Sequence, residues 1–533
     1  MNKLIILPIL LITISVFSQN WKNGVWNADN GNGTYTNPIL HSDYSDPDVC
    51  QAGDYFYMTA SSFNCVPGLP VLRSSDLVNW ELIGYALTEL YDPMFDQPQH
   101  GNGVWAPAIR FHNNEFYIYW GDPDLGIYVV KTNNPEGSWS KPHLVHSDKG
   151  WIDPCPFWDE DGKAYLVHAY AGSRSGIKSI LVMNEMAPDG MSINPQPVLV
   201  FDGHENHVTI EGPKLYKRNG YYYIFAPAGG VKPGWQTILR SKNIYGPYED
   251  KVVLHQGNTN INGPHQGGFL ELESGESWFI HFQDKDACGR IVHLQPVNWV
   301  NNWPMMGYDV NSDGIGEPVH TYQKPKVKLQ SKLLTIPASD EFNSTTLGIQ
   351  WQWHANPETE WAFTSPYGYL RMNCIMPPVD ELNFWDLPNL LLQKLPSDEF
   401  TATTKFTFYP KEDGDRAGLI VMGEDYAYLA CESYNGKTYI TFNNCTNART
   451  GGKEKQVDKI EVQGNDFYFR VVVEQGAVCR FSFSTDSTNY KQLEEKFTAR
   501  AGRWIGAKVG IFASKSQSTN DSGYADFDWF RFE

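Results

Sequence analysis

The segment EGPKLYKRNGYYYIF, residues 211–225, contains the pattern that decides the fold. In it an Asn-Gly turn is followed by a run of tyrosines, which is typical of a short β-strand after a tight turn. Four further strands of this kind occur in the first 310 residues, at intervals of roughly 50 to 60 residues. They begin at Tyr55, Phe116, Tyr165 and Trp278. The repeat predicts an all-β domain, a propeller of five four-stranded blades.

A short polar motif lies about ten residues ahead of each aromatic strand, where a propeller places the start of its innermost strand. The five motifs are Asp46-Pro47-Asp48, Trp105-Ala106-Pro107, Asp153-Pro154-Cys155, Glu211-Gly212-Pro213 and His265-Gln266-Gly267. Equivalent positions in a radial repeat meet at one end of the axis, so the leading residues are predicted to share a pocket. Each motif alone is more often an ordinary turn. Five in register favour a shared site.

The composition narrows the classes of partner. Asp plus Glu number 61 against 42 Lys plus Arg, and the formal charge is −19. This sign disfavours nucleic acid and anionic lipid, whose phosphates require neutralisation by basic side chains. Aromatic residues make up 14% of the chain, which suits β-rich packing and also stacking on sugar rings.

Residues 1–18 read as a signal peptide, because Lys3 precedes an apolar run over residues 4–17. The run is too short to span a bilayer, so we expect no membrane insertion and export to the periplasm or the cell exterior. The eight cysteines lack metal-ligand spacing and are predicted to be mainly buried thiols, with room for one or two disulfides. The sequence leaves the oligomeric state open.

The predicted propeller covers residues 19–322, and a linker follows over residues 323–338. Residues 339–533 alternate in the manner of a concanavalin-like β-sandwich, as in the strand FYFRVVV at residues 467–473. Just before the linker, Asp309, Asn311, Asp313 and Gly314 resemble the first half of a calcium loop. His320 stands where that loop needs a final Glu, so an Asp/Gly turn and a calcium site both remain open.

Acidic residues that converge on a pocket rimmed by aromatics suit hydrolysis of a glycosidic bond. One carboxylic acid protonates the leaving oxygen, while one carboxylate activates water. The carboxyl with less solvent and more negative neighbours keeps its proton near neutral pH. Asp153 can be such a neighbour, raising the pKa of the acid without itself reacting.

Six segments together resemble glycoside hydrolase family 43. They are Asn37-Pro38-Ile39-Leu40, Asp46-Pro47-Asp48, Val104-Trp105-Ala106-Pro107, Asp153-Pro154, Glu211-Gly212-Pro213 and Gly289-Arg290. The resemblance implies a five-bladed propeller that inverts the anomeric centre. It also implies that Asp46 is the general base, that Glu211 is the general acid and that Asp153 tunes the pKa of the acid.

The same resemblance bears on which residues contact the substrate and on whether a metal ion is bound. It implies that Arg290 hydrogen-bonds the terminal sugar, and it makes Trp105, Phe63, His265 and Gln266 candidate substrate-binding residues. The chemistry needs no cofactor or catalytic metal. A structural calcium ion is left open at His265, which lies on the axis, or in the loop at residues 309–313.

The predicted function is an inverting exo-glycosidase that releases a terminal pentose, α-L-arabinofuranose or β-D-xylose or both, from plant hemicellulose oligosaccharides. The alternatives are an endo-acting arabinanase and a non-catalytic glycan-binding propeller. Asn64-Cys65-Val66 stands where many xylosidases of this type carry bulkier aromatics, and Ala108 stands where they often have His. These two departures favour the arabinofuranoside, by about 1–3 kcal/mol per contact at most.

Overall fold

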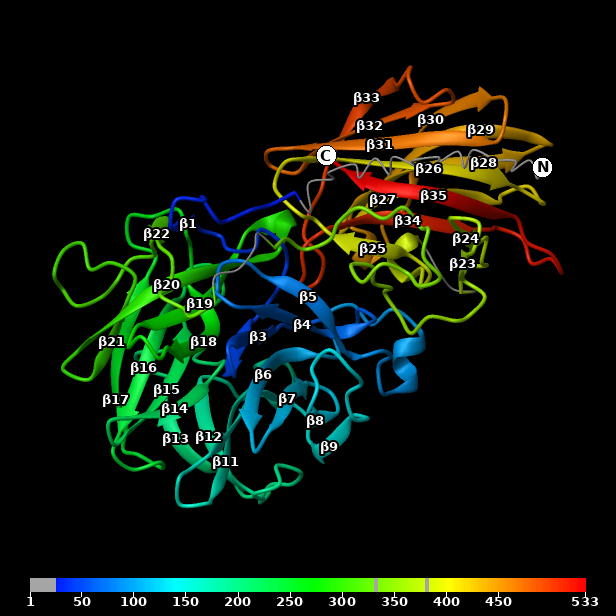
Figure 1. Ribbon diagram of the computed structural model, residues 1–533. Helices are drawn as coiled ribbons and strands as arrows, with labels where there is room; N and C mark the ends of the chain where they lie inside the picture. Colours follow the sequence, from blue (N-terminus) through cyan, green and yellow to red (C-terminus); the bar gives the residue numbers. More distant parts are fainter. Residues whose placement is uncertain (1–24, 330–333, 379–382) are drawn as a thin grey trace, which may run out of the picture.

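The computed structural model describes residues 25–329, 334–378 and 383–533, which form an all-β propeller beside a β-sandwich (Figure 1). The predicted signal peptide lies outside these residues. In the described part of the chain, helix is confined to α1 (Gly172–Ser175) and to four 3₁₀ turns. The turns are η1 (Pro93–Asp96), η2 (Asp286–Cys288), η3 (Phe384–Asp386) and η4 (Ala448–Thr450). None of the described helices is long and apolar enough to cross a membrane.

The propeller has five antiparallel sheets, each built from four consecutive strands, as predicted. The first two blades are β2 (Asp48–Ala52), β3 (Tyr55–Thr59), β4 (Gly68–Ser74), β5 (Glu81–Leu87), then β6 (Trp105–His112), β7 (Glu115–Asp122), β8 (Gly126–Thr132), β9 (His143–His146). The third and fourth are β10 (Trp151–Trp158), β11 (Ala164–Tyr170), β12 (Ile180–Met186), β13 (Val198–Asp202), then β14 (Lys214–Arg218), β15 (Tyr221–Ala228), β16 (Trp235–Ser241), β17 (Glu249–His255). The fifth is β18 (His265–Glu271), β19 (Ser277–Asp284), β20 (Arg290–Val300), β21 (Trp303–Met306).

The predicted aromatic strands are the second strands of the five blades. Between β14 and β15, Asn219 and Gly220 both have positive φ, 51° and 74°, and Arg218 pairs with Tyr221. This is the two-residue hairpin turn whose twist matches that of the flanking strands. Both faces of a blade pack into apolar clusters: in β15 the consecutive residues Tyr223 and Ile224 point to opposite faces, and both are fully buried.

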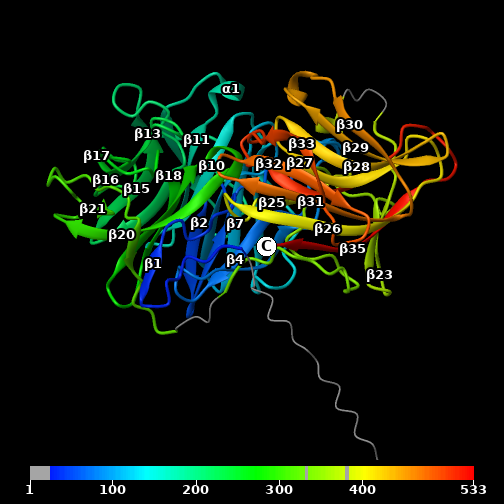
Figure 2. The same ribbon diagram turned by 90° about the horizontal axis from the view of Figure 1, so that it is seen from above.

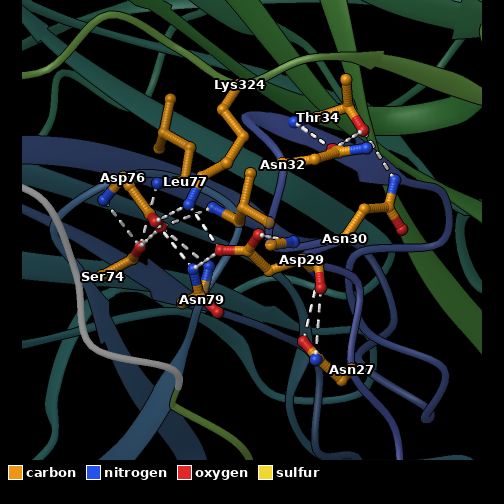
Figure 3. A network of polar contacts seen from close by, with 12 residues as sticks. Asn27, Asp29, Asn30, Asn32, Thr34, Ser74, Asp76, Leu77, Asn79 and Lys324 are labelled. Carbon is orange, nitrogen blue, oxygen red and sulfur yellow. Dashed lines mark hydrogen bonds and ion pairs between the residues drawn. The ribbon is translucent and has the colours of Figure 1, made fainter.

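A short ribbon and a polar network hold the two ends of the propeller domain together. Strand β1 (Thr34–Thr36) pairs with β22 (Thr321–Gln323) at the start of the linker. Next to the ribbon, Lys324 Nζ contacts Asp29 at 2.6 Å and Asp76 at 2.9 Å (Figure 3). Because no strand of the described chain is exchanged between the first and last blades, these contacts help to hold the ring closed.

The C-terminal domain is a sandwich of two antiparallel sheets, as predicted. In spatial order, the seven-stranded sheet consists of β23 (Ala362–Ser365), β24 (Tyr369–Asn373), β35 (Tyr524–Phe532), β26 (Phe400–Tyr409), β31 (Asp466–Glu474), β32 (Val478–Ser484) and β33 (Lys491–Thr498). The six-stranded sheet consists of β25 (Leu391–Lys394), β34 (Lys508–Ser514), β27 (Arg416–Met422), β28 (Tyr426–Tyr434), β29 (Lys437–Cys445) and β30 (Lys455–Val462).

The sandwich packs directly against the propeller beside the first blade (Figures 1 and 2). One buried apolar cluster runs from Val66 and Phe95 of the propeller to Trp351 of the sandwich. A backbone hydrogen bond of 2.6 Å from Trp353 to Val66 joins the domains in the same region. The interface therefore lies next to residues 61–66, which border the predicted site.

Two secondary predictions concern cysteines and calcium. All eight cysteines are buried and free, so the chain has thiols rather than disulfides. In the loop near the linker, Asp309 Oδ2 accepts a hydrogen bond from Gly314 N at 3.0 Å and Asp313 Oδ1 accepts one from Ile315 N at 2.8 Å. These bonds form ordinary Asp turns. Among the described residues, no three His, Cys, Asp or Glu side chains are placed to hold a metal ion.

Candidate active site

The backbone at the start of each innermost strand turns the same way in all five blades. Its left-handed residues are Asp46 (φ 53°), Ala106 (φ 36°), Asp153 (φ 59°), Gly212 (φ 59°) and Gln266 (φ 38°). In four blades a proline follows. The pairing register of β6, β10 and β18 also shifts here, as in a β-bulge. Bulges re-aim side chains, so these turns are themselves what directs the polar motifs towards the axis.

Seven of the eight predicted site residues line a single cavity of about 200 Å³ at this end of the propeller. They are Asp46, Phe63, Trp105, Asp153, Glu211, Gln266 and Arg290. The eighth, His265, has no exposed surface, and its Nε2 lies 3.5 Å from Glu211 Oε1. The structure thus brings together residues that are up to 244 positions apart in the sequence.

Asp46 is held by two donors. Arg290 Nη1 lies 3.0 Å from Asp46 Oδ1 and 3.1 Å from Oδ2, while Ser61 Oγ donates to Oδ2 at 2.6 Å. The Ser61 hydroxyl accepts a hydrogen bond of 2.7 Å from Ala106 N, which fixes its rotamer. The carboxylate is therefore oriented from two sides, although it is only 5% exposed.

Glu211 and Asp153 share an environment that favours protonation. Burial, then Asp153 and then Asp46 raise the pKa of Glu211, and Arg290 and Lys178 oppose them. Burial and then Asp46 likewise raise the pKa of Asp153, against a 2.8 Å hydrogen bond from Gly212 N to its Oδ2. Glu211 therefore retains its proton to higher pH than an exposed glutamate, as a general acid requires.

His265 stays neutral near physiological pH, because burial first and Arg290 second lower its pKa to about 3. Its contact with Glu211 is thus not an ion pair. Neither ring nitrogen of His265 has a hydrogen-bond partner among the described residues. Calcium prefers six to eight oxygen ligands, so an imidazole beside a single carboxyl oxygen does not fit a protein-built calcium cage. No step of the reaction below is routed through a metal.

The sandwich also contributes to the pocket, which the repeat pattern of the propeller did not indicate. Trp504, in the loop between β33 and β34, lines the cavity. Its ring centre is 6.2 Å from that of Trp105, and the Arg290 guanidinium lies 5.9 Å from it. The next residue, Ile505, packs against Phe63. An aromatic residue between two glycines, as in the segment GRWIG at residues 502–506, was the available signal, but nothing linked it to the propeller.

Asp43 connects this loop to Arg290 and was also missed. Its Oδ1 accepts a hydrogen bond from Arg290 N at 2.9 Å, and its Oδ2 accepts one from Gly506 N at 3.0 Å. The side chain is buried. One carboxylate therefore sets the sandwich loop and the strand that carries Arg290 in fixed relation to each other.

Comparisons with known proteins agree with this geometry. The sequence profile of glycosyl hydrolases family 43 matches residues 35–304, which is half of the chain. A putative beta-xylosidase of Xylanibacter ruminicola is 37% identical, over 95% of this chain and 90% of its own length. The chain belongs to glycosyl hydrolase family 43. Residues 339–533 match a second profile, the beta-xylosidase C-terminal concanavalin A-like domain.

Family 43 relatives cover the whole described architecture. A non-reducing end alpha-L-arabinofuranosidase of Bacteroides ovatus is 29% identical, over 96% of this chain and 97% of its own. The crystal structure of a family 43 protein from Bacillus licheniformis superposes with a TM-score of 0.80 at 25% identity, over 94% of this chain and 99% of that one. The chain is a glycoside hydrolase with the propeller and sandwich of its family, which removes the non-catalytic alternative.

Proposed function

We propose that this glycoside hydrolase removes a single pentose from the non-reducing end of hemicellulose oligosaccharides, with inversion. A β-D-xyloside is the first candidate substrate and an α-L-arabinofuranoside the second. The observation that carries the proposal is the convergence of Asp46, Asp153 and Glu211 on one pocket, of which Trp504 of the sandwich forms a wall. A wall in this place disfavours the open groove of an endo-acting arabinanase.

The reaction follows from the positions of the carboxyls. Asp46 removes a proton from a water molecule, whose oxygen attacks the anomeric carbon. Glu211 gives its proton to the glycosidic oxygen, which leaves with the bonding electrons as the aglycone hydroxyl. Asp153 does not react, but its charge keeps Glu211 protonated until this step. Arg290 has further N–H donors beside the one that holds Asp46, and these can bind hydroxyls of the terminal sugar.

The pocket bears on which pentose is preferred. The arabinofuranoside preference rested on missing aromatic bulk near the terminal sugar, around Cys65. The structure supplies a ring there from outside the propeller, because Trp504 lines the cavity together with Phe63. Trp504 therefore weakens the first of the two departures behind that preference, and the second, Ala108 in place of His, stays as it was. Relatives named beta-xylosidase at 37% and 33% identity support the xyloside as the first candidate.

Product analysis on matched 4-nitrophenyl β-D-xyloside and α-L-arabinofuranoside tests substrate and stereochemistry together. We expect pentose release from at least one of them, and NMR early in the reaction should show the inverted anomer. A retained anomer would contradict the roles of Asp46 and Glu211, because retention needs a covalent intermediate. Release of arabino-oligosaccharides from linear arabinan, without free pentose, would instead establish the endo-acting alternative.

Two variants distinguish the role of the general acid, Glu211, from that of the general base, Asp46. Glu211→Ala should lose most activity on xylobiose, whose leaving group needs a proton, and keep more on 4-nitrophenyl glycosides, whose leaving group does not. Asp46→Ala should lose activity on both, because each needs an activated water. The proposal is wrong if the two variants show the same dependence on leaving group. A crystal structure should place the two carboxyls about 6.5–9.5 Å apart.

A further inference from the structure

The mouth of the catalytic pocket carries cationic side chains that the proposed chemistry does not use. Lys178 is exposed and lines the cavity. Arg503 lies with its guanidinium 4.2 Å from the ring centre of Trp504, which lines the same cavity. The guanidinium of Arg174 lies 5.9 Å from the ring centre of Trp105. Lys178 lines the cavity itself, whereas Arg174 and Arg503 lie against aromatic rings that line it. The three cations come from two domains of a chain whose net charge is −19.

Lys178 and Arg503 have no ion-pair partner in the described part of the chain. Arg174, in contrast, is neutralised by Asp124 at 3.1 Å. Glu424 is the carboxylate that acts on the pKa of Arg503, which it raises. This carboxylate is itself paired with Arg449 at 3.0 Å and with Arg500 at 2.9 Å. The rim thus has uncompensated positive charge.

The position of Lys178 identifies the side of the substrate that it faces. Lys178 and Glu211 line the same cavity, and the ammonium opposes the rise in the pKa of that carboxyl. Glu211 protonates the leaving oxygen, so a cation beside it faces the aglycone rather than the terminal sugar. Neutral hydroxyls can be bound by uncharged amide and hydroxyl groups, so they do not require a cation. A carboxylate on the aglycone does benefit from it.

We propose that Lys178 and Arg503 form an aglycone site that favours acidic oligosaccharides, those with a uronic acid carboxylate close to the scissile bond. The inference rests on the proposed function, whose leaving side defines the aglycone. Lys178 supplies an ammonium from the third blade, and Arg503 a guanidinium from the sandwich loop. The sandwich therefore takes part in selecting the substrate as well as in forming the pocket wall.

The test uses two aryl β-D-xylosides that differ only in charge, the 4-(carboxymethyl)phenyl and 4-(carbamoylmethyl)phenyl glycosides. The methylene group insulates the leaving oxygen, so both aglycones leave with similar ease. We expect kcat/KM of the wild type to be about three- to tenfold higher for the carboxylate, the range for two partly exposed charge pairs. About 0.5 M salt should reduce the ratio, because such pairs are screened.

The variants Lys178→Gln and Arg503→Gln should each lower the ratio, and the double variant should bring it to about one. Using the ratio removes any change in Glu211 that affects both substrates alike. Lys163→Gln, which alters an exposed lysine in the β10–β11 turn of the third blade, is the matched control and should keep the wild-type ratio. A wild-type ratio of one overturns the proposal, and so does a ratio that the double variant leaves unchanged.

Binding distinguishes this proposal from the proposed function. Calorimetry with Asp46→Ala measures the affinities of the same two glycosides without turnover. Preferential binding of the carboxylate that the double substitution abolishes supports the acidic aglycone site, even if neither xyloside is hydrolysed and the xylosidase proposal fails. Equal affinities overturn the site, even if both glycosides are hydrolysed.

Discussion

Replacing Asp153 by Asn tests whether a non-reacting carboxylate keeps the general acid protonated. The amide has the shape of the carboxyl and can accept the hydrogen bond from Gly212 N, now 2.8 Å from Asp153 Oδ2. It cannot carry the negative charge. The variant therefore changes the electrostatics around Glu211 and leaves the bulged turn of β10 in place.

The size of the effect follows from the causes acting on Glu211. Burial, the largest of them, persists in the variant, as does Asp46, so the pKa of Glu211 should fall only partway to the ordinary glutamate value. A single opposite charge within about 4–6 Å shifts the pKa of a carboxyl by about 1–3 units, and we take a like charge to act with similar size in the other direction. Burial also raises the pKa of Asp153, so its charge is incomplete at neutral pH and the lower end applies. We expect a fall of about one unit, or about 1.4 kcal/mol.

The assay is the pH dependence of kcat/KM, whose alkaline limb reports deprotonation of the acid in the free enzyme. Glu211 must be protonated to act, so in Asp153→Asn the alkaline limb should move to lower pH by about one unit. Asp161→Asn, in an exposed turn of the same blade, should leave the limb in place. An unmoved alkaline limb in Asp153→Asn would refute the tuning role, and a shift confined to the acid limb would reassign Asp153 to the base.

Three other predictions concern the pocket wall at Trp504, the hydrogen bonds of Asp43 and the effect of Asp153 on stability. Trp504→Ala should raise KM for aryl pentosides about three- to tenfold, the worth of an aromatic contact, with little change in Tm because the ring is 38% exposed; an unchanged KM would remove Trp504 from the site. Asp43→Ala should lower the free energy of unfolding in urea by about 1–3 kcal/mol for each backbone donor it strands, Arg290 N and Gly506 N, in addition to the bond from Ser45 Oγ, and Asp43→Asn by less; equal losses would contradict the bonding. The raised pKa of Asp153 means that the contribution of this residue to stability is fullest in acid and falls as pH rises, so the gain in Tm of Asp153→Asn over wild type should be larger at about pH 8.5 than at about pH 3.5. A gain that is constant with pH would show that Asp153 titrates normally.

The propeller was predictable because its signals are local. A tight turn followed by an aromatic strand marks each blade in the sequence. The turn at Asn219-Gly220 has the two positive φ angles that these residues favour. Radial repetition then converts equal sequence positions into spatial neighbours. Asp46, Asp153 and Glu211 could therefore be placed in one pocket from the sequence, without knowledge of any contact between blades.

The rest of the site depends on contacts with no local signal. Ser61, Asp43 and Trp504 act through partners that lie 15 to 463 positions away, and none of them occupies a repeat position. Periodicity cannot locate such residues, because the docking of the sandwich on the first blade is set by a large apolar interface. The arabinofuranoside preference has the same weakness, since it counted only the aromatic rings of the propeller.

The alternative interpretation of the polar motifs as ordinary turns is correct about their backbone and incomplete about their function. Non-glycine residues with positive φ cost about 1–3 kcal/mol each and persist only where the surroundings impose them. Here Asp46, Ala106, Asp153 and Gln266 bear that cost at equivalent places, and the bulges at the last three aim side chains at the axis. Relaxing any of these turns would return the strand to its regular alternation and move its polar side chain off the axis. The strain is therefore a condition of bringing three carboxyls close enough to shift one another's protonation.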